Sequence, residues 1–184
     1  MSNYILPLGA LTDWFSETKP PHCKESIAAW LYDHNSLTKK LELTCSDFTV
    51  QIKQQVNIIP SGLLSKYFQN EEKILVREVF LFCDNKPVVF AQTEIPFSTL
   101  SSHQTQLAEI GEQSLGKILF QDPTMLRGQI EVTEFSMGSI FHDLADDLKQ
   151  SITHSLWARR SLFYLNNKPL LVSELFLPAS GIYN

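Results

Sequence analysis

The sequence predicts an α+β fold, with a single antiparallel sheet of about six strands and helices packed on one side. Two pairs of apolar runs carry this prediction, because residues that favour a tight turn join the members of each pair. Residues 84–87 (DNKP) separate ILVREVFLFC from VVFAQTEI, and residues 166–167 (NN) separate the last two runs of the chain. The chain contains no repeat and no low-complexity segment, so we expect one domain over residues 1–184.

The first sixty residues predict an arm, two helices and one strand. Residues 1–24 contain three prolines and no sustained period, so we expect an extended arm that closes over the core. Residues 25–34 place apolar side chains at the i, i+3, i+4 spacing of a buried helix face, and Ser36 is placed to cap a second short helix. Residues 45–59 alternate apolar and polar side chains, which is typical of a half-buried strand paired antiparallel with its neighbour.

Helical spacing returns after the first hairpin. Residues 101–120 have a helical pattern that Gly111 and Gly116 divide into short pieces. Residues 127–133 then predict another strand. Residues 138–153 predict an amphipathic helix, because their apolar side chains recur at helical spacing while three aspartates face away.

Two of the predicted core strands contain embedded charges. Glu174 interrupts the apolar run KPLLVSELFLPAS, so we expect this carboxylate to be paired, protonated or catalytic. Arg77 and Glu78 interrupt ILVREVFLFC in the same way, and they point to opposite faces of their strand. Two charged core strands suggest one shared pocket, and a buried ion pair between Arg77 and Glu174 is the structural alternative.

Five sequence blocks resemble the chorismate pyruvate-lyases, which convert chorismate to 4-hydroxybenzoate and pyruvate at the head of ubiquinone synthesis. The blocks are LVRE at 75–78, TEIPFSTL at 93–100, LGK at 115–117, LWARRS at 156–161 and KPLLVSELFLPAS at 168–180. The resemblance runs in order from about Trp30 to the C-terminus, and the last block is its most specific part. It implies a carbon–oxygen lyase of this α+β fold. It also implies that the helix at 138–153 is an insertion, which we interpret as a surface elaboration rather than a lid.

The resemblance further implies which residues form the site. Arg77 would clamp a substrate carboxylate with its planar, always charged guanidinium, and Glu174 would hydrogen-bond the ring hydroxyl and assist proton transfer. Backbone groups near Leu37 and Leu115 would complete the carboxylate site and enclose the ring. Aromatisation of the ring supplies the driving force, so we expect neither a metal nor another cofactor. The five histidines show no metal-binding spacing.

One position departs from the family pattern. The family usually has a second arginine where this chain has Gln92, so we expect Gln92 to bind the second substrate carboxylate without a charge. The lost charge-assisted contact, about 1.5–3 kcal/mol, predicts a kcat/KM about tenfold to a hundredfold below that of an arginine enzyme. Gln92→Arg should then lower the KM for chorismate. Arg127, at the start of a neighbouring strand, is the candidate replacement cation.

Two other functions remain open from the sequence. The fold is similar to the effector-binding module of some bacterial transcription regulators, so a non-catalytic small-molecule binding domain is one alternative. The apolar arm at 1–24 is too short for their winged helix, and the lone acid Glu174 favours catalysis. The other alternative is an impaired relative that binds and delivers 4-hydroxybenzoate with strong product inhibition, and it depends on the departure at Gln92.

Composition narrows the partners. The net charge of −5 and the lack of any basic cluster larger than two residues argue against nucleic acid. The first residues lack a basic region and a cleavage site, so we expect no signal peptide and no membrane span. The three cysteines have no metal-ligand spacing and are expected to be free thiols. We therefore expect a cytoplasmic monomer whose partner is the small molecule chorismate.

Overall fold

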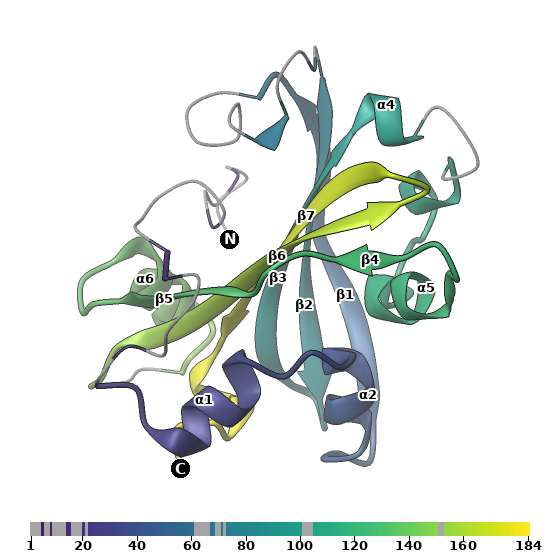
Figure 1. The fold of residues 1–184 in the computed structure, drawn as a ribbon. Helices are drawn as coiled ribbons and strands as arrows, with labels where there is room; N and C mark the ends of the chain where they lie inside the picture. Colours follow the sequence, from purple (N-terminus) through teal and green to yellow (C-terminus); the bar gives the residue numbers. More distant parts are fainter. Residues whose placement is uncertain are drawn as a thin grey trace.

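Seven antiparallel strands form one strongly twisted sheet (Figure 1). The computed structural model describes residues 5, 8, 14, 15, 20, 22–60, 67, 68, 71, 73–100, 105–150 and 153–184. The sheet order is β1-β2-β3-β7-β6-β4, and β5 also pairs with β6. The strands are β1 Phe48–Ile58, β2 Ile74–Cys83, β3 Lys86–Pro96, β4 Leu126–Arg127, β5 Glu131–Phe135, β6 Leu156–Leu165 and β7 Lys168–Phe176. The predicted α+β class is confirmed, with one strand more than the six expected.

Both predicted hairpins are present, each with a two-residue turn. Asp84 and Asn85 join β2 to β3 with φ angles of 48° and 63°, and Asn166 and Asn167 join β6 to β7 with 48° and 62°. Positive φ at both central residues is the geometry of a two-residue hairpin turn, which Asn and Asp tolerate better than other non-glycine residues. The turn at 166–167 sets the pairing along β6 and β7, whereas a bulge between Leu81 and Phe82 shifts the pairing of β2 with β3 by one residue.

The strand predicted at 127–133 is two strands, β4 and β5, separated by a bulge. Arg127 lies opposite Phe163 and Glu131 lies opposite Arg160, so residues 128–130 face only two residues of β6. The extra residue interrupts the ladder, as a β-bulge does. The single strand predicted here was wrong because a bulge leaves little trace in the alternation of side chains.

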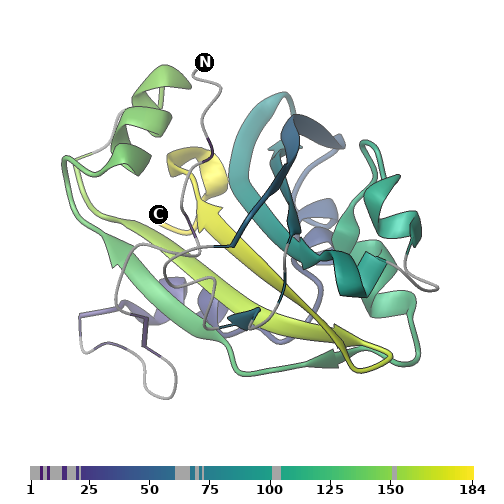
Figure 2. The same cartoon turned by 90° about the horizontal axis from the view of Figure 1, so that it is seen from above.

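Three short helices cover one face of the sheet, and a fourth lies on the other. The covering helices are α1 Glu25–Leu31, α2 Leu37–Glu42 and α5 Leu115–Gln121. Helix α6, Ile140–Asp147, packs Phe141 and Leu144 against the opposite face, where Phe80 and Phe90 lie. Figure 2 shows α6 and α1 on opposite sides of the β6–β7 hairpin. The amphipathic helix is confirmed, but it departs from the prediction that all helices lie on one side.

The other short helices connect these elements. They are α4 Phe97–Leu100, η1 Thr105–Ala108 and η2 Pro178–Ser180. Helices η1 and α5 lie in the region 101–120 that was predicted as short helical pieces, of which residues 101–104 lie outside the described residues. The predicted cap of α2 is present, since the Ser36 hydroxyl accepts a hydrogen bond from the Lys39 backbone N–H at 3.4 Å.

The described parts of the N-terminal arm pack against the sheet. Leu8 is fully buried in the cluster that contains α6. Phe15 pairs with Val132 of β5 through two backbone hydrogen bonds of 2.9 Å. These contacts agree with an arm that closes over the core. Most of its other residues, and most of the segment at 61–72, lie outside the described residues.

The cysteine prediction needs a correction. Cys45 and Cys83 are joined by a disulfide, and Cys23 is a buried free thiol. The pairing follows from the sheet, because Phe48 at the start of β1 lies opposite Cys83 at the end of β2, and the two cysteine Cα atoms are 5.5 Å apart. Sequence separation gave no sign of this proximity.

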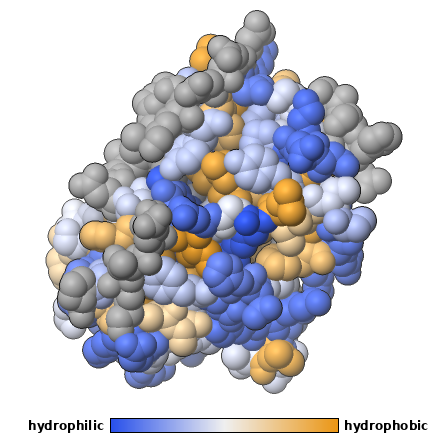
Figure 3. Space-filling model, viewed as in Figure 1, coloured by the Kyte–Doolittle hydropathy of each residue, from blue (hydrophilic) through white to orange (hydrophobic). Residues whose placement is uncertain are grey.

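Large exposed hydrophobic side chains are scattered over the described surface. On the face that Figure 3 shows, hydrophobic residues form separate patches among hydrophilic ones. The exposed residues are Phe15, Leu43, Ile59, Phe97, Leu126 and Met137. Among the described residues, no helix has both the length and the apolar character needed to cross a bilayer.

Candidate active site

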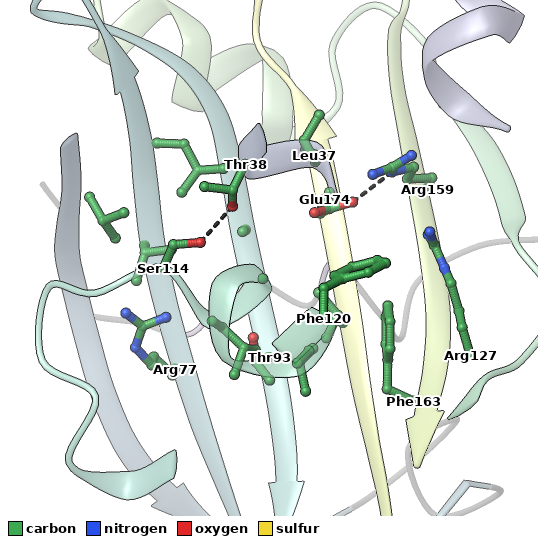
Figure 4. Close-up of a pocket in the computed structure, with 18 of the residues that line it drawn as sticks. Leu37, Thr38, Arg77, Thr93, Ser114, Phe120, Arg127, Arg159, Phe163 and Glu174 are labelled. Carbon is green, nitrogen blue, oxygen red and sulfur yellow. Dashed lines mark hydrogen bonds and ion pairs between the residues drawn. The ribbon is translucent and has the colours of Figure 1, made fainter. Parts of the chain in front are cut away.

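A pocket lies between the sheet and the helices α2 and α5, and its empty space of about 560 Å³ includes a part that is open to solvent (Figure 4). Its charged lining residues are Arg77, Arg127, Arg159 and Glu174, and the remaining lining is largely apolar. The described residues contain no group of three or more His, Cys, Asp or Glu side chains that could hold a metal ion. The donor set therefore favours an anion.

Arg77 lies on β2 at one end of the pocket and is only 2% exposed. Its Nη2 atom donates to the carbonyl oxygens of Gly111, at 2.8 Å, and Gln113, at 3.1 Å. Its Nε is buried without a hydrogen-bond partner, and no described acidic residue forms an ion pair with it. Burial lowers the pKa of Arg77. An anionic ligand would accept the unused hydrogen bond and balance the buried positive charge.

Glu174 lies on β7 at the other end of the pocket and pairs with Arg159 of β6 (Figure 4). The Arg159 Nε donates to the Glu174 Oε2 at 2.6 Å. The Nη1 of Arg159 donates to the carbonyl oxygens of Trp30 and Asp33, each at 2.9 Å, near the C-terminal end of α1. Glu174 is therefore ion-paired, which was one of the predicted possibilities, but its partner is Arg159 and not Arg77.

Arg127 adds a third cation near the Glu174 end of the pocket. Its Nε donates to the Ser161 hydroxyl at 3.1 Å, and its Nη1 donates to the His34 carbonyl oxygen at 3.1 Å. The guanidinium carbon lies 5.1 Å from the centre of the Phe163 ring, within cation–π range. Arg127 and Arg159 together fasten the connection between α1 and α2 to the sheet.

The start of α2 and the start of α5 close the pocket opposite the sheet. Leu37 and Leu115, the first residues of the two helices, both line it. The Thr38 and Ser114 hydroxyls are hydrogen-bonded at 2.5 Å and join the helices. Gly116 permits this contact, because a Cβ atom there would lie 2.9 Å from the Thr38 Oγ1. A larger residue at 116 would push the two helices apart.

Gln92 does not line the pocket, which contradicts its predicted role in binding substrate. Its neighbours Ala91 and Thr93 point into the pocket, so Gln92 points to the opposite face of β3. There its Nε2 donates to Glu78 Oε1 at 2.8 Å, and both residues are fully buried. The expected loss of kcat/KM and the expected benefit of Gln92→Arg therefore have no structural basis.

Arg159 was missed as a site residue, although the sequence contained a signal for it. The turn at 166–167 makes Leu165 and Lys168 opposite neighbours, and counting back along both strands places Arg159 opposite Glu174. The pair could have been found from the predicted hairpin.

Comparisons with known proteins identify the family of this chain. The family model described as chorismate lyase matches residues 11–184. A relative from Psychromonas ingrahamii named "Probable chorismate pyruvate-lyase" is 59% identical over 180 residues, which is 97% of each chain. A Pectobacterium carotovorum protein named "Chorismate pyruvate-lyase" is 32% identical over 185 residues, covering all of this chain and 94% of its own.

Solved structures show the same fold at low identity. The effector domain of PhnF from Mycobacterium smegmatis has a TM-score of 0.58 and 11% identity, over 79% of this chain and 90% of its own. A GntR-family regulator from Enterococcus faecalis has a TM-score of 0.52 and 19% identity, over 71% of this chain and 94% of its own. These likenesses concern the fold alone. The family model and the close relatives together show that this chain belongs to the chorismate lyase family.

Proposed function

We propose that this protein converts chorismate to 4-hydroxybenzoate, the ring precursor of ubiquinone, and pyruvate. One observation carries the proposal beyond family membership: two arginines that have no acidic partner among the described residues line the same pocket as an ion-paired glutamate. Chorismate carries two carboxylates and a ring hydroxyl, which are complementary to such a set. In the reaction, the bond from the ring carbon to the ether oxygen breaks and its electron pair leaves with oxygen. The hydrogen on the hydroxyl-bearing carbon leaves as a proton, and the released enolpyruvate gains a proton at its methylene carbon.

Arg77 holds the ring carboxylate in this proposal. Its unpartnered Nε supplies a donor to a carboxylate at the β2 end of the pocket. A charge-assisted contact of this kind is strong in a site from which water is excluded. The backbone near Leu37 and Leu115 completes the enclosure, because the first amide groups of a helix have no partner within the helix.

Glu174 accepts the hydrogen bond of the ring hydroxyl. It lies on β7, two strands from Arg77 on β2, so about 10 Å of sheet separates the two strands. That separation suits a six-membered ring whose carboxylate and hydroxyl are opposite each other. Arg159 holds Glu174 through its Nε, so it is a positioning residue for the acid. In this position Glu174 can also receive the proton from the ring carbon that bears the hydroxyl.

The remaining pocket residues hold the ring in place and exclude water from it. Phe120, Phe163 and Val172 line it together with Leu119. Apolar walls hold the ring in one orientation, so that the carbon–oxygen bond breaks in a preset conformation. The catalytic contribution of the protein is then orientation and electrostatic stabilisation, while aromatisation drives the reaction.

The proposal is tested by adding chorismate to the purified protein and measuring 4-hydroxybenzoate and pyruvate together. Equimolar formation of both products, lost in Arg77→Ala and Glu174→Ala, is the expected result. Formation of neither product would refute the proposal. Solvent isotope effects in the wild type and in Glu174→Gln then test proton transfer, because an unchanged rate and isotope effect would exclude an essential acid–base role.

A second candidate function is a non-catalytic domain that binds an aromatic acid. The likeness to effector domains of GntR-family regulators favours it, since that fold also occurs in ligand-binding domains. The same assay separates the two functions. Tight binding of 4-hydroxybenzoate without turnover of chorismate would support the binding domain.

A further inference from the structure

Arg127 has donors and charge that the protein itself leaves unused. Its Nε and Nη1 donate to Ser161 and to the carbonyl oxygens of Asp33 and His34. Within the described part of the chain, its Nη2 has no hydrogen bond and no carboxylate lies at ion-pair distance. The guanidinium group therefore lines the pocket with its Nη2 available to donate hydrogen bonds to a ligand.

The charges that line the pocket match a dianion. Three arginines and one glutamate give a formal charge of +2. Arg159 and Glu174 neutralise each other through their 2.6 Å contact, which leaves Arg77 and Arg127. Burial, with the charge of Arg159 nearby, lowers the pKa of Arg127 to about 10. An anion beside Arg127 would relieve the cost of holding this cation in the pocket.

The geometry of the substrate places its second carboxylate at the Arg127 end. The proposed function puts the ring carboxylate on Arg77 and the ring hydroxyl on Glu174. The enolpyruvyl ether is attached to the carbon next to the hydroxyl-bearing carbon, so its carboxylate falls on the Glu174 side of the ring. In Figure 4, Arg127 and Arg159 lie on that side, and Arg77 lies on the other.

We infer that Arg127 binds the enolpyruvyl carboxylate and is the residue that distinguishes chorismate from its aromatic product. Arg159 is less suited to this role, since its Nε and Nη1 already donate to Glu174 and to the carbonyl oxygens of α1 and its C-terminal connection. The inference rests on the proposed function and assigns a binding residue to it. 4-Hydroxybenzoate has no second carboxylate, so Arg127 contributes to substrate binding and not to product binding.

The test compares the KM for chorismate with the inhibition constant of 4-hydroxybenzoate in Arg127→Gln. The KM should rise about tenfold to a hundredfold, because a charge-assisted contact is lost, while the inhibition constant stays within about twofold. Arg127→Lys keeps the charge without the planar fork and should recover part of the loss. Lys39→Gln is the matched control, since it removes one positive charge from an exposed position of α2.

The two constants also separate the possible failures. If Arg127 only fastens the connection between α1 and α2, then Arg127→Gln disturbs the whole pocket and both constants rise together. That result overturns the inference, as does a KM that stays unchanged. If wild-type protein does not turn over chorismate at all, the proposed function fails first.

Discussion

The two faces of the sheet carry similar charges in different surroundings. Adjacent residues divide between them: Arg77 faces the pocket and Glu78 faces away, and Arg159 faces the pocket while Arg160 faces away. On the far face, Glu78 accepts hydrogen bonds from Lys53 at 2.6 Å and from two glutamines. On the pocket face, neither Arg77 nor Arg127 has a described acidic partner. Charge left unpaired beside a cavity, and not charge embedded in a strand, therefore marks the site.

On the far face, most of the buried polar side chains form hydrogen bonds with one another. The register places Gln54, Glu78, Gln92 and Ser173 side by side across four strands, and Arg160 follows on the next. Arg160 donates to Glu131 at 2.6 Å and to Tyr67 at 2.5 Å. A bulge between Ile52 and Gln54 lets two successive residues, Lys53 and Gln54, reach Glu78. Because these polar groups bind one another, we interpret the network as structural and not as a ligand-binding site.

The largest expected effect comes from removing the positive charge of Arg77 on the pocket face. Arg77→Gln should lower kcat/KM about a hundredfold to a thousandfold, because an interaction of about 2.7–4 kcal/mol with the ring carboxylate is lost. Substrate and product share this carboxylate, so the inhibition constant of 4-hydroxybenzoate should rise as well. Steady-state kinetics measure both constants.

Arg77→Lys is the control for charge, and it should be less impaired than Arg77→Gln. Arg77 also holds the carbonyl oxygens of Gly111 and Gln113, so thermal unfolding of each variant is measured beside its kinetics. A loss of activity below about threefold in a folded Arg77→Gln protein would remove Arg77 from the site.

A smaller effect, on stability and not on catalysis, is expected from Gln92, which lies on β3 and faces away from the pocket. Gln92→Leu removes one donor from the buried Glu78 and should lower the free energy of unfolding by about 1–3 kcal/mol. The KM for chorismate should stay within about twofold, since Gln92 does not line the pocket. Gln92→Arg should likewise leave the KM unchanged. A KM raised tenfold in Gln92→Leu with unchanged stability would contradict the division between the faces.

The last expected effect is a dependence of stability on pH, which comes from Glu94 on the far face. Burial raises the pKa of Glu94 from 4.5 to about 8, opposed by Arg160 and assisted by Glu78. The folded protein thus keeps Glu94 protonated where the unfolded chain releases the proton. Its contribution to stability is full below about pH 4.5 and is lost as the pH rises toward about 8. The loss is at most about 1.4 kcal/mol per pH unit.

Urea unfolding at pH 5 and pH 8 measures this contribution. Glu94→Gln keeps the shape of the side chain and cannot ionise, so its stability should fall less between the two pH values than that of the wild type. Equal falls in the two proteins would show that Glu94 ionises alike in the folded and unfolded chain.

Much of the fold could be predicted from local sequence. The hairpins followed from turn residues that tolerate positive φ, and the first two helices followed from apolar spacing and the Ser36 cap. The split between β4 and β5, the side on which α6 packs and the Cys45–Cys83 pairing could not be predicted. Each depends on which distant segments come together, and neither periodicity nor turn chemistry contains that information.

The site was predicted in part for the same reason. Arg77, Glu174, Leu37 and Leu115, which the resemblance assigns to the site, line one pocket, and their roles toward substrate stay predictions. Gln92 occupies the family position of the second arginine, but it lies on the face of β3 away from the pocket, and sequence position alone does not show the face. The third function, an impaired relative, depended on a role of Gln92 in the pocket and loses its support. The single-domain organisation, the monomeric state and the cytoplasmic location stay predictions.

The most direct test is a crystal structure of the protein with 4-hydroxybenzoate. We predict that the ligand lies in the pocket between the sheet, α2 and α5, with its carboxylate on Arg77 and its hydroxyl on Glu174. Arg127 should lie near the ring without contacting either polar group. A ligand bound on the far face, or bound in the pocket with its carboxylate on Arg127 and its hydroxyl on Arg77, would contradict this assignment of the two ends.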